Sequence, residues 1–248
     1  MRDPEILKLT KSLEYYRKMY AELAQLAGEL AHEIKNPLSI IHMNMDMLAE
    51  DFTEATNRRD RRTQTTIETV KDQCLRLENL LNDFLRFSKQ SQINLIPGDL
   101  NAQIERVLAL YLPQAEQSGI TVLRYLDPDL PMILLSSESL QAALVNLVKN
   151  SLEAMDGKRG ELTVRTRTTL NGVALDLIDT GSGMDQQTAL NMFEPFYTTK
   201  QGGSGLGLPT ARKIIEAHGG RIDVQSSEGQ GTQFTLEFPV PPRLAPAE

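Results

Sequence analysis

Hydrophobic residues in the first 90 positions of the chain repeat with the spacing of α-helices. From residue 23 to residue 52 they recur three and four positions apart, which places them on one face of a helix. From residue 67 to residue 88 the two spacings alternate as a heptad repeat. The pattern predicts two long helices, each with one narrow apolar stripe: Leu23, Ala27, Leu30, Ile34, Leu38, Ile41, Met45, Leu48 and Phe52 in the first, and Ile67, Val70, Cys74, Leu77, Leu81, Phe84 and Ser88 in the second.

Two antiparallel helices with such narrow stripes cannot cover each other completely. Pairing two copies of the hairpin into a dimeric four-helix bundle covers both stripes, so we expect a homodimer. Cys74 falls on the second stripe and is expected to be a small core residue. Residues 53–62 contain four arginines and interrupt the pattern. We interpret them as a solvated hairpin tip, with a basic patch for a partner as the alternative.

Residues 7–25 also have helical spacing, with Tyr15, Tyr16 and Tyr20 among interleaved charges. A signal-transmitting coiled coil and a stabilising extension of the first helix both fit this pattern. We assign residues 1–22 to this N-terminal helix and residues 23–92 to the dimerisation domain.

Helical and strand-like patterns mix beyond residue 98. A polar stretch ends in the turn sequence Pro97-Gly98-Asp99, where we place a domain boundary. Asn171-Gly172 is a strong β-hairpin signal between two β-rich runs. The sequence thus predicts an α+β multidomain protein, with an α/β two-layer sandwich over residues 98–242 and a tail over residues 243–248. Within the sandwich we expect helices over residues 100–117, 137–155 and 213–217, and strands over residues 121–126, 132–135, 162–169, 173–178, 221–226 and 232–240.

Composition narrows the classes of function. The chain has 248 residues and a formal net charge of −7, which argues against a dedicated nucleic-acid surface. The single cysteine excludes an intramolecular disulfide and a multi-cysteine metal site. No apolar run approaches the length of a membrane span, and the N-terminus lacks the layout of a signal peptide. We expect a cytoplasmic protein, membrane-tethered only if the chain is a fragment of a longer one.

The segment HEIKNPL, residues 32–38, places reactive groups before a proline inside the first helix. His32 points away from the apolar stripe, and Asn36, four residues later, shares its outward face. The carboxylate of Glu33 can hold the proton of one imidazole nitrogen and make the other nitrogen more nucleophilic. A plain surface histidine is the alternative. We predict that His32 is a nucleophile and that Pro37 kinks the helix.

Four segments of the second half carry groups suited to a nucleotide. Asn146 and Asn150 share a helix face, and neutral carboxamide oxygens suit Mg²⁺ beside phosphate. DTGSGM, residues 179–184, follows a strand, where a carboxylate can accept from the exocyclic amine of a base. GGSGLGL, residues 202–208, leads into a helix and can present N–H groups to phosphate. FEPFYTTK, residues 193–200, adds a lysine that can reach a phosphate. Taken alone, the Asn pair also fits surface or capping residues, DTGSGM also fits an ordinary β-turn, and GGSGLGL also fits a flexible linker.

The order of these segments resembles the catalytic core of two-component sensor histidine kinases, especially the nitrogen-regulation type. HEIKNPL resembles the phosphoacceptor box of that family, and NLVKNSLEAM (residues 146–155) resembles its asparagine box. DTGSGM and GGSGLGL resemble its two glycine boxes, and FEPFYTTK its phenylalanine box. The resemblance extends from residue 23 to residue 241.

The resemblance implies a protein histidine kinase whose helical hairpin is the histidine phosphoacceptor domain. His32 would attack the γ-phosphorus of ATP, with Glu33 as general base. The phosphoryl group would pass to an aspartate in the receiver domain of a response regulator. Asn36 lies where the family orients a water, which implies that the same surface also dephosphorylates the regulator.

The same resemblance implies a Bergerat-type ATP site that binds ATP and Mg²⁺. Asn150 would be the metal ligand, with Asn146 supporting the metal and the phosphates. Asp179 would bind the adenine amine. A lid over residues 186–204 would cover the phosphates. The base would be surrounded by Gly181, Gly183 and Thr232, and the phosphates held by Lys200, Gly203, Gly205, Leu206 and Gly207.

The sequence departs from the family pattern at a few positions. Ser136 stands where relatives commonly carry Asp, Ser151 replaces a common Ala, and Glu153 stands where some relatives carry a basic residue near the phosphates. Two other functions fit parts of the sequence. One is a different ATPase of the same superfamily, of the mismatch-repair, topoisomerase or chaperone kind, which needs no HEIKNPL segment. The other is a dimeric scaffold that binds ATP only as a structural ligand.

Overall fold

The computed structural model describes residues 34–52, 58–89, 93–155, 159–200 and 203–241. The predicted phosphoacceptor His32 and its neighbour Glu33 lie outside the described residues. The chain divides into two compact units, residues 1–91 and residues 92–248.

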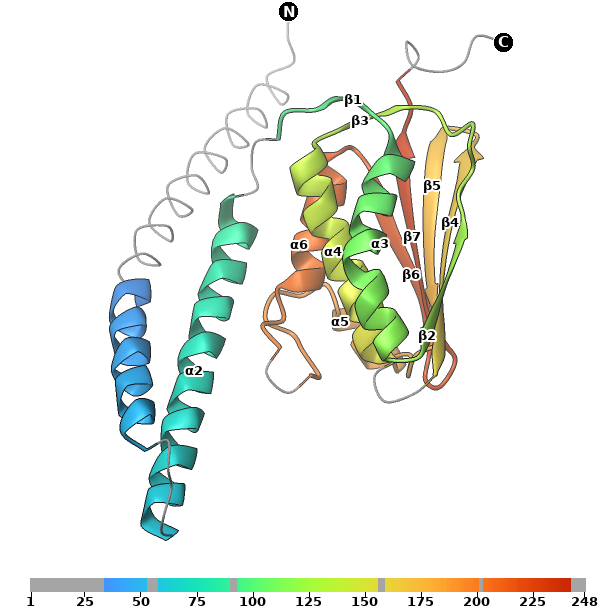
Figure 1. The fold of residues 1–248 in the computed structure, drawn as a ribbon. Helices are drawn as coiled ribbons and strands as arrows, with labels where there is room; N and C mark the ends of the chain where they lie inside the picture. The colour runs from blue at the N-terminus through green and yellow to red at the C-terminus, as the bar shows by residue number, and fades with distance from the viewer. Residues whose placement is uncertain (1–33, 53–57, 90–92, 156–158, 201–202, 242–248) are drawn as a thin grey trace, which may run out of the picture. The chain divides into compact units, whose positions relative to one another are not determined.

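The first unit contains two helices that lie side by side (Figure 1). One occupies residues 34–51, and the other is α2 (Arg58–Lys89). Lys71 of α2 forms an ion pair with Asp46 of the first helix at 2.6 Å. The predicted helical N-terminal region is therefore confirmed. Three residues of the predicted stripes are buried: Leu38, Ile67 and Cys74.

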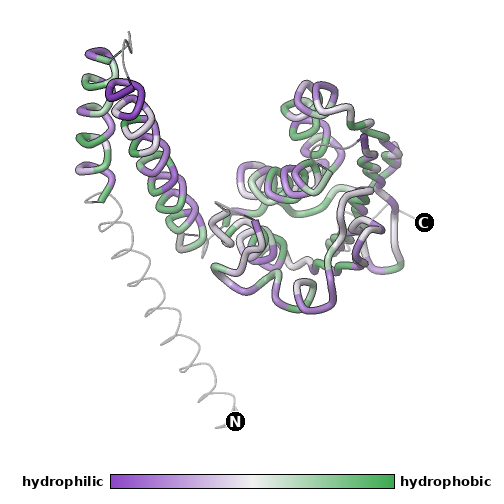
Figure 2. Tube along the Cα trace, turned by 90° about the horizontal axis from the view of Figure 1, so that it is seen from below, coloured by the Kyte–Doolittle hydropathy of each residue, from purple (hydrophilic) through white to green (hydrophobic). Residues whose placement is uncertain are grey.

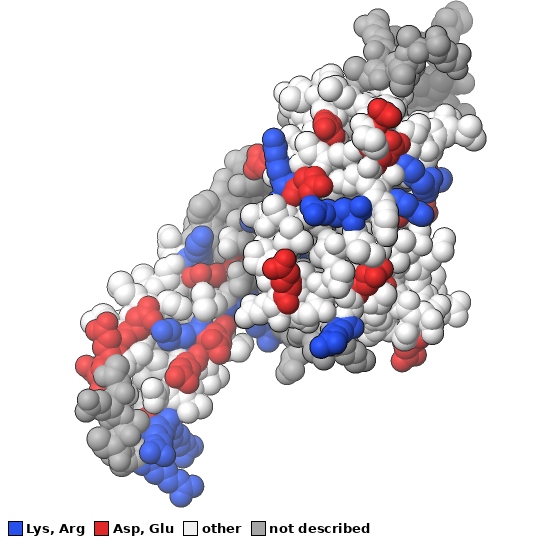
Figure 3. Space-filling view, turned by 45° about the vertical axis from the view of Figure 1, so that its right-hand side comes forward, with Lys and Arg blue, Asp and Glu red and all other residues white. Residues whose placement is uncertain are grey.

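The arginine-rich segment belongs to α2 rather than to a loop. The prediction of a hairpin tip was wrong for residues 58–62, which are helical. Arginine has a high helix propensity, so a segment without apolar residues can still continue a helix. In Figure 3 basic side chains gather at the lower end of the view, where α2 begins. The arginines of this segment are Arg58, Arg59, Arg61 and Arg62.

One chain leaves many apolar side chains of the helical unit exposed. Ile40, Met43 and Met47 are 56%, 57% and 61% exposed, and Leu77 of the predicted second stripe is 49% exposed. Figure 2 shows hydrophobic and hydrophilic positions alternating along both helices. The two helices of one chain therefore do not cover their own apolar surface. None of the described helices is long and apolar enough to cross a membrane.

The second unit is built on a five-stranded sheet with the strand order β2-β4-β5-β7-β6. β2 and β4 are parallel, and the other neighbouring pairs are antiparallel. The predicted hairpin at Asn171 connects β4 to β5. The strands are β2 (Ile120–Tyr125), β4 (Gly160–Thr169), β5 (Gly172–Asp179), β6 (Arg221–Ser227) and β7 (Gly231–Pro239).

Three helices cover one face of this sheet (Figure 1). Their apolar side chains pack against alternate residues of the strands, and Leu147, Leu175 and Phe234 are completely buried between the layers, at 0% exposure. The helix-on-sheet packing confirms the predicted two-layer sandwich. The helices are α3 (Leu100–Gln117), α4 (Ser137–Ala154) and α6 (Gly207–Ala217).

Two short elements were not predicted. β1 (Ile96–Gly98) pairs with β3 (Ile133–Leu135) in a separate two-stranded sheet. β1 has three residues and includes Pro97 and Gly98, so its sequence is typical of a turn. α5 (Gln186–Asn191) is a six-residue helix capped by the side chain of Asp185, which accepts from the N–H of Thr188. Six residues are too few to show a helical period.

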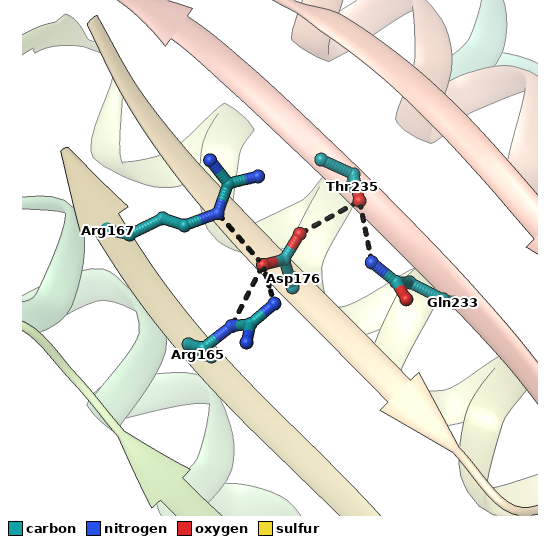
Figure 4. Close-up of polar contacts among 5 residues, drawn as sticks. All are labelled: Arg165, Arg167, Asp176, Gln233 and Thr235. Atoms are coloured by element: carbon teal, nitrogen blue, oxygen red, sulfur yellow. Dashed lines mark hydrogen bonds and ion pairs between the residues drawn. The ribbon is translucent and has the colours of Figure 1, made fainter. Parts of the chain in front are cut away.

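A buried carboxylate lies on the face of the sheet that the helices leave open (Figure 4). The side chain of Asp176 is 0% exposed, because Arg165 and Arg167 of β4 extend over it. Its Oδ2 accepts from Arg165 at 2.9 Å and from Arg167 at 3.3 Å, and its Oδ1 accepts from Thr235 of β7 at 2.8 Å. This cluster joins the three central strands through side chains.

Candidate nucleotide site and phosphoacceptor segment

The phosphoacceptor segment is described only in part. Asn36 and Pro37 are exposed residues of the helix over residues 34–51, and Leu38 is buried. Pro37 is thus inside a helix, as predicted. Asn36 and the nucleotide-site residues belong to different compact units.

The predicted adenine ligand Asp179 ends β5 and is buried. Its Oδ1 accepts from the N–H of Gly181 at 2.9 Å and from the N–H of Thr232 at 3.2 Å. Thr232 is its cross-strand partner on β7, so the sheet register brings the two residues together. Its Oδ2 is buried and has no hydrogen-bond partner among the described residues.

This environment acts on the ionisation of Asp179. Burial raises the pKa of the carboxyl above its ordinary value, against the N–H groups of Gly181 and Thr232, which favour the ionised form. The hydroxyl of Ser151 on α4 also lowers the pKa of Asp179, although it forms no hydrogen bond with the carboxylate. The Oγ of Ser151 is itself buried without a partner among the described residues. A buried acceptor left open in this way fits an amine donor from a ligand.

The first glycine box requires its glycines. A Cβ atom at Gly181 would lie 2.8 Å from the Cβ of Ala154, so this loop packs directly against the end of α4. The N–H of Ser182 donates to the carbonyl of Ala154 at 3.0 Å. Gly183 has φ +64°, a conformation that favours glycine. These contacts hold the loop between α4 and the end of the sheet.

The predicted metal ligand Asn150 already contacts a cation. The ammonium group of Lys200 donates to Oδ1 of Asn150 at 2.7 Å and to Oε2 of Glu153 at 2.6 Å. Asn150 and Glu153 are both on α4, three residues apart, so their side chains share a face. The family resemblance placed Lys200 and Asn150 in one site and Glu153 near the phosphates, but it did not predict the contact between Glu153 and Lys200.

The second glycine box connects this lysine to α6. Gly205 has φ +67°, and its carbonyl accepts from the N–H of Phe196 at 3.0 Å. α6 begins at Gly207, and among the described residues no side chain caps its first turn. Just before the helix, the N–H of Leu206 donates to Oγ of Ser204 at 3.3 Å. A Cβ atom at Gly207 would lie 3.3 Å from Oδ1 of Asn146, which places the second predicted Asn beside this helix start. The remaining predicted residues, Gly203 and Leu206, lie on the same connection.

The arrangement has the chemistry of a nucleotide site. Asp179 offers a buried acceptor for a base amine, and the neutral oxygens of Asn146 and Asn150 are hard ligands suited to Mg²⁺. The α6 start and Lys200 offer positive groups to phosphate. Among the described residues no cluster of three acidic, histidine or cysteine side chains forms a separate metal site.

Two family models match the chain. Residues 22–93 match the His Kinase A (phospho-acceptor) domain, and residues 136–242 match the histidine kinase-, DNA gyrase B- and HSP90-like ATPase. The chain is 34% identical over 218 residues to sensor histidine kinase ZraS of Escherichia coli, an alignment that covers 88% of this chain and 46% of that protein. The chain spans about half the length of the curated relatives it matches.

Solved structures have the same fold. Full-length ShkA in complex with AMPPNP is 26% identical, with a TM-score of 0.70 over 90% of this chain and 47% of that chain. Histidine kinase ThkA in complex with response regulator protein TrrA has a TM-score of 0.66 over 99% of this chain and 70% of that chain. At 24% identity, this second likeness shows the fold alone.

Proposed function

We propose, from the premise that the chain belongs to the sensor histidine kinases and carries their phosphoacceptor and ATPase domains, that it transfers phosphate from ATP to His32. The phosphoryl group then passes to an aspartate in the receiver domain of a response regulator. The observation that carries this proposal is the buried Oδ2 of Asp179, which has no hydrogen-bond partner among the described residues.

Asp179 selects adenine. Its Oδ1 is held by two main-chain N–H groups, so its Oδ2 is fixed in position and free to accept from the exocyclic amine. A base with a carbonyl at the same position would place acceptor against acceptor, and this buried mismatch is unfavourable. Gly181 and Gly183 leave room for the flat ring in this interpretation, and Thr232 completes its surroundings.

The phosphate end lies between α4 and the start of α6. Lys200 and the backbone of Gly203, Gly205, Leu206 and Gly207 hold the triphosphate. Asn150 would hold Mg²⁺, with support from Asn146, and the ion when bound neutralises phosphate charge. The residues of the chain position and screen the phosphates, which is the main requirement of phosphoryl transfer. ShkA, which shares the fold, is described in complex with the ATP analogue AMPPNP.

His32 is the nucleophile in this proposal, and Glu33 takes its proton and orients its ring. The γ-phosphorus–oxygen bond to ADP breaks as the nitrogen–phosphorus bond forms. In a separate reaction, Asn36 orients a water that hydrolyses the phosphoryl group from the aspartate of the regulator. ThkA, which shares the fold, is described in complex with a response regulator.

In this proposal the chain consists of two domains and forms a homodimer. We place the phosphoacceptor domain at residues 23–92 and the ATP-binding domain at residues 98–242. The apolar side chains left exposed on the helices of one chain support a homodimer. We assign the nitrogen-regulation type from the overall resemblance of the sequence, and a cytoplasmic location from the single cysteine, which fits a reducing compartment.

The test is the chemical character of the bound phosphate. With radiolabelled ATP and Mg²⁺, the chain should acquire acid-labile, alkali-stable phosphate on His32. His32→Gln should lose the label and keep ATP binding. Hydrolysis of ATP without label on the protein would favour another ATPase of the superfamily, and binding without either reaction would favour a scaffold. Transfer to purified receiver domains would identify the partner.

A further inference from the structure

Two oxygens of α4 converge on one ammonium group. Oδ1 of Asn150 and Oε2 of Glu153 lie 2.7 Å and 2.6 Å from Nζ of Lys200. Each acceptor is within hydrogen-bonding distance of the same cation, so the position of Nζ is a cation position defined by both side chains. Because Nζ lies 2.7 Å from Oδ1 of Asn150, another cation that binds this oxygen has to displace the ammonium.

Glu153 has a second cation nearby. Its carboxylate lies 3.8 Å from Nζ of Lys149, one helical turn earlier on α4, and 2.6 Å from Nζ of Lys200. The closer and stronger partner is therefore the lysine of the phenylalanine box. When Lys200 leaves, Lys149 remains as a counter-ion for the carboxylate, so release of Lys200 does not leave an isolated charge.

The main chain around Lys200 is held separately from its side chain. Its N–H donates to Oγ1 of Thr198 at 3.1 Å, and its carbonyl accepts from the N–H of Gly203 at 3.2 Å. The side chains of Lys200 and Glu153 are each 40% exposed, so Nζ can leave Glu153 without disturbing packed atoms. A rotation of the lysine side chain is enough to release it.

We propose that Glu153 is a positioning residue that holds Lys200 on Asn150 in the nucleotide-free chain and thereby lowers the affinity for nucleotide. Triphosphate binding requires Lys200 to exchange a carboxylate for phosphate oxygens, and a cation at Asn150 requires Nζ to leave. Glu153 opposes both steps by stabilising the unbound arrangement. The inference rests on the proposed function, because it assumes that the phosphates bind beside Lys200.

The first experiment measures nucleotide affinity by calorimetry with a non-hydrolysable ATP analogue and Mg²⁺. Glu153→Gln should bind about three- to fivefold more tightly, the size of effect expected for an exposed ion pair. Glu105→Gln is the matched control, since it removes one carboxylate of an exposed pair with Arg124 in the same unit; its affinity should equal that of the wild type. In a Lys200→Ala background, Glu153→Gln should have no further effect. An unchanged or weaker affinity in the single variant, or an equal gain in the Lys200→Ala background, would overturn the proposal.

The second experiment needs no nucleotide and so separates this inference from the proposed function. Acetylation of Lys200 by a limiting acylating reagent, followed by mass spectrometry, reports how firmly the amine is held, with exposed Lys35 as the internal reference. Glu153→Gln should speed acetylation of Lys200 severalfold, and Glu105→Gln should not. Equal rates in wild type and Glu153→Gln would refute the hold on Lys200. A wild-type chain that binds no nucleotide would instead refute the proposed function.

Discussion

The imidazole of His218, at the end of α6, accepts a hydrogen bond from the backbone N–H of Ser136, at the start of α4. The Nε2···N distance is 3.0 Å, and Nδ1 of the same ring lies 2.7 Å from the carbonyl oxygen of Ile214. A carbonyl can only accept, so Nδ1 carries the proton and Nε2 is the acceptor. His218 is buried against Phe238, and it therefore ties the two helices that carry the candidate phosphate site.

Replacing His218 should weaken the fold through this contact. His218→Leu fills the buried position with an apolar side chain but leaves the N–H of Ser136 without its acceptor, which should lower the free energy of unfolding by about 1–3 kcal/mol. Urea denaturation followed by circular dichroism measures the change. Ser136→Ala is the matched control, because it keeps the N–H and removes only the hydroxyl contact with Ser139; it should cost less than about 0.5 kcal/mol. Equal losses in both variants would contradict this role of His218.

The carboxylate of Asp176 should make stability depend on pH. Burial alone would raise the pKa of Asp176, but hydrogen bonds from Thr235, Arg165 and Arg167 hold it below its ordinary value of 3.8. A lowered pKa in the folded state contributes stability above pH 3.8 that is lost as pH falls through the folded pKa. Asp176→Asn should therefore lower the free energy of unfolding by about 1–3 kcal/mol at pH 7, and the difference from wild type should shrink in acid.

Denaturation curves at neutral and acidic pH test this prediction. Asp223→Asn is the control, since Asp223 is 62% exposed and lies 3.5 Å from Arg221 on the same sheet. Its effect should stay within about 0.5 kcal/mol at either pH. A constant loss for Asp176→Asn across the pH range would show that packing, and not ionisation, explains its effect.

Regular spacing made most of the fold predictable. The helical period over residues 100–117 coincides with α3, because a long helix with one buried face imposes a period on the sequence. The β-rich runs on either side of the Asn171-Gly172 turn identified β4 and β5. β1 was not predicted, because its three residues are too few to show a period and they pair with β3, about forty positions away in the sequence. The arginines that begin α2 were not predicted as helical because this end of the helix has no apolar stripe to detect.

The candidate site was predictable wherever its residues share an element. The spacing of Asn146 and Asn150 placed both on one face of α4. The contacts of Lys200 with Asn150 and Glu153 cross 50 and 47 positions of sequence, and no spacing rule connects them. The Asp179–Thr232 pair likewise depends on the register of β5 and β7, which tertiary structure determines. The resemblance to a family supplied Thr232, and the sequence alone did not.

The exposed apolar residues of the helical unit predict a dimer that one charge can weaken. Leu77 is 49% exposed and belongs to the predicted second stripe. Leu77→Lys loses apolar burial of about 1.5 kcal/mol or more, and a two-fold symmetric interface contains the change twice. Light scattering after size exclusion should therefore show a shift from dimer to monomer at micromolar concentration. Leu110→Lys, at a 72% exposed position of α3, should leave the mass unchanged. A wild-type chain that is monomeric at high concentration would contradict the dimer itself.

Asp179 should separate nucleotide binding from folding. In Asp179→Asn, the amide oxygen can still accept from Gly181 and Thr232, but the amide nitrogen then replaces the open Oδ2. This places a donor against the amine of adenine, so ATP binding should weaken at least about tenfold, or about 1.4 kcal/mol.

The stability of Asp179→Asn should not fall together with its affinity for ATP. The raised pKa of Asp179 means that its contribution to stability is present below pH 3.8 and is lost as pH rises through the folded pKa. At pH 7 the neutral amide removes this unfavourable buried charge, so the variant should unfold at the same or a higher urea concentration than wild type. Calorimetric titration with ATP and urea denaturation of the same preparation test both halves together. Loss of stability along with binding would assign Asp179 a structural role instead of recognition of the base.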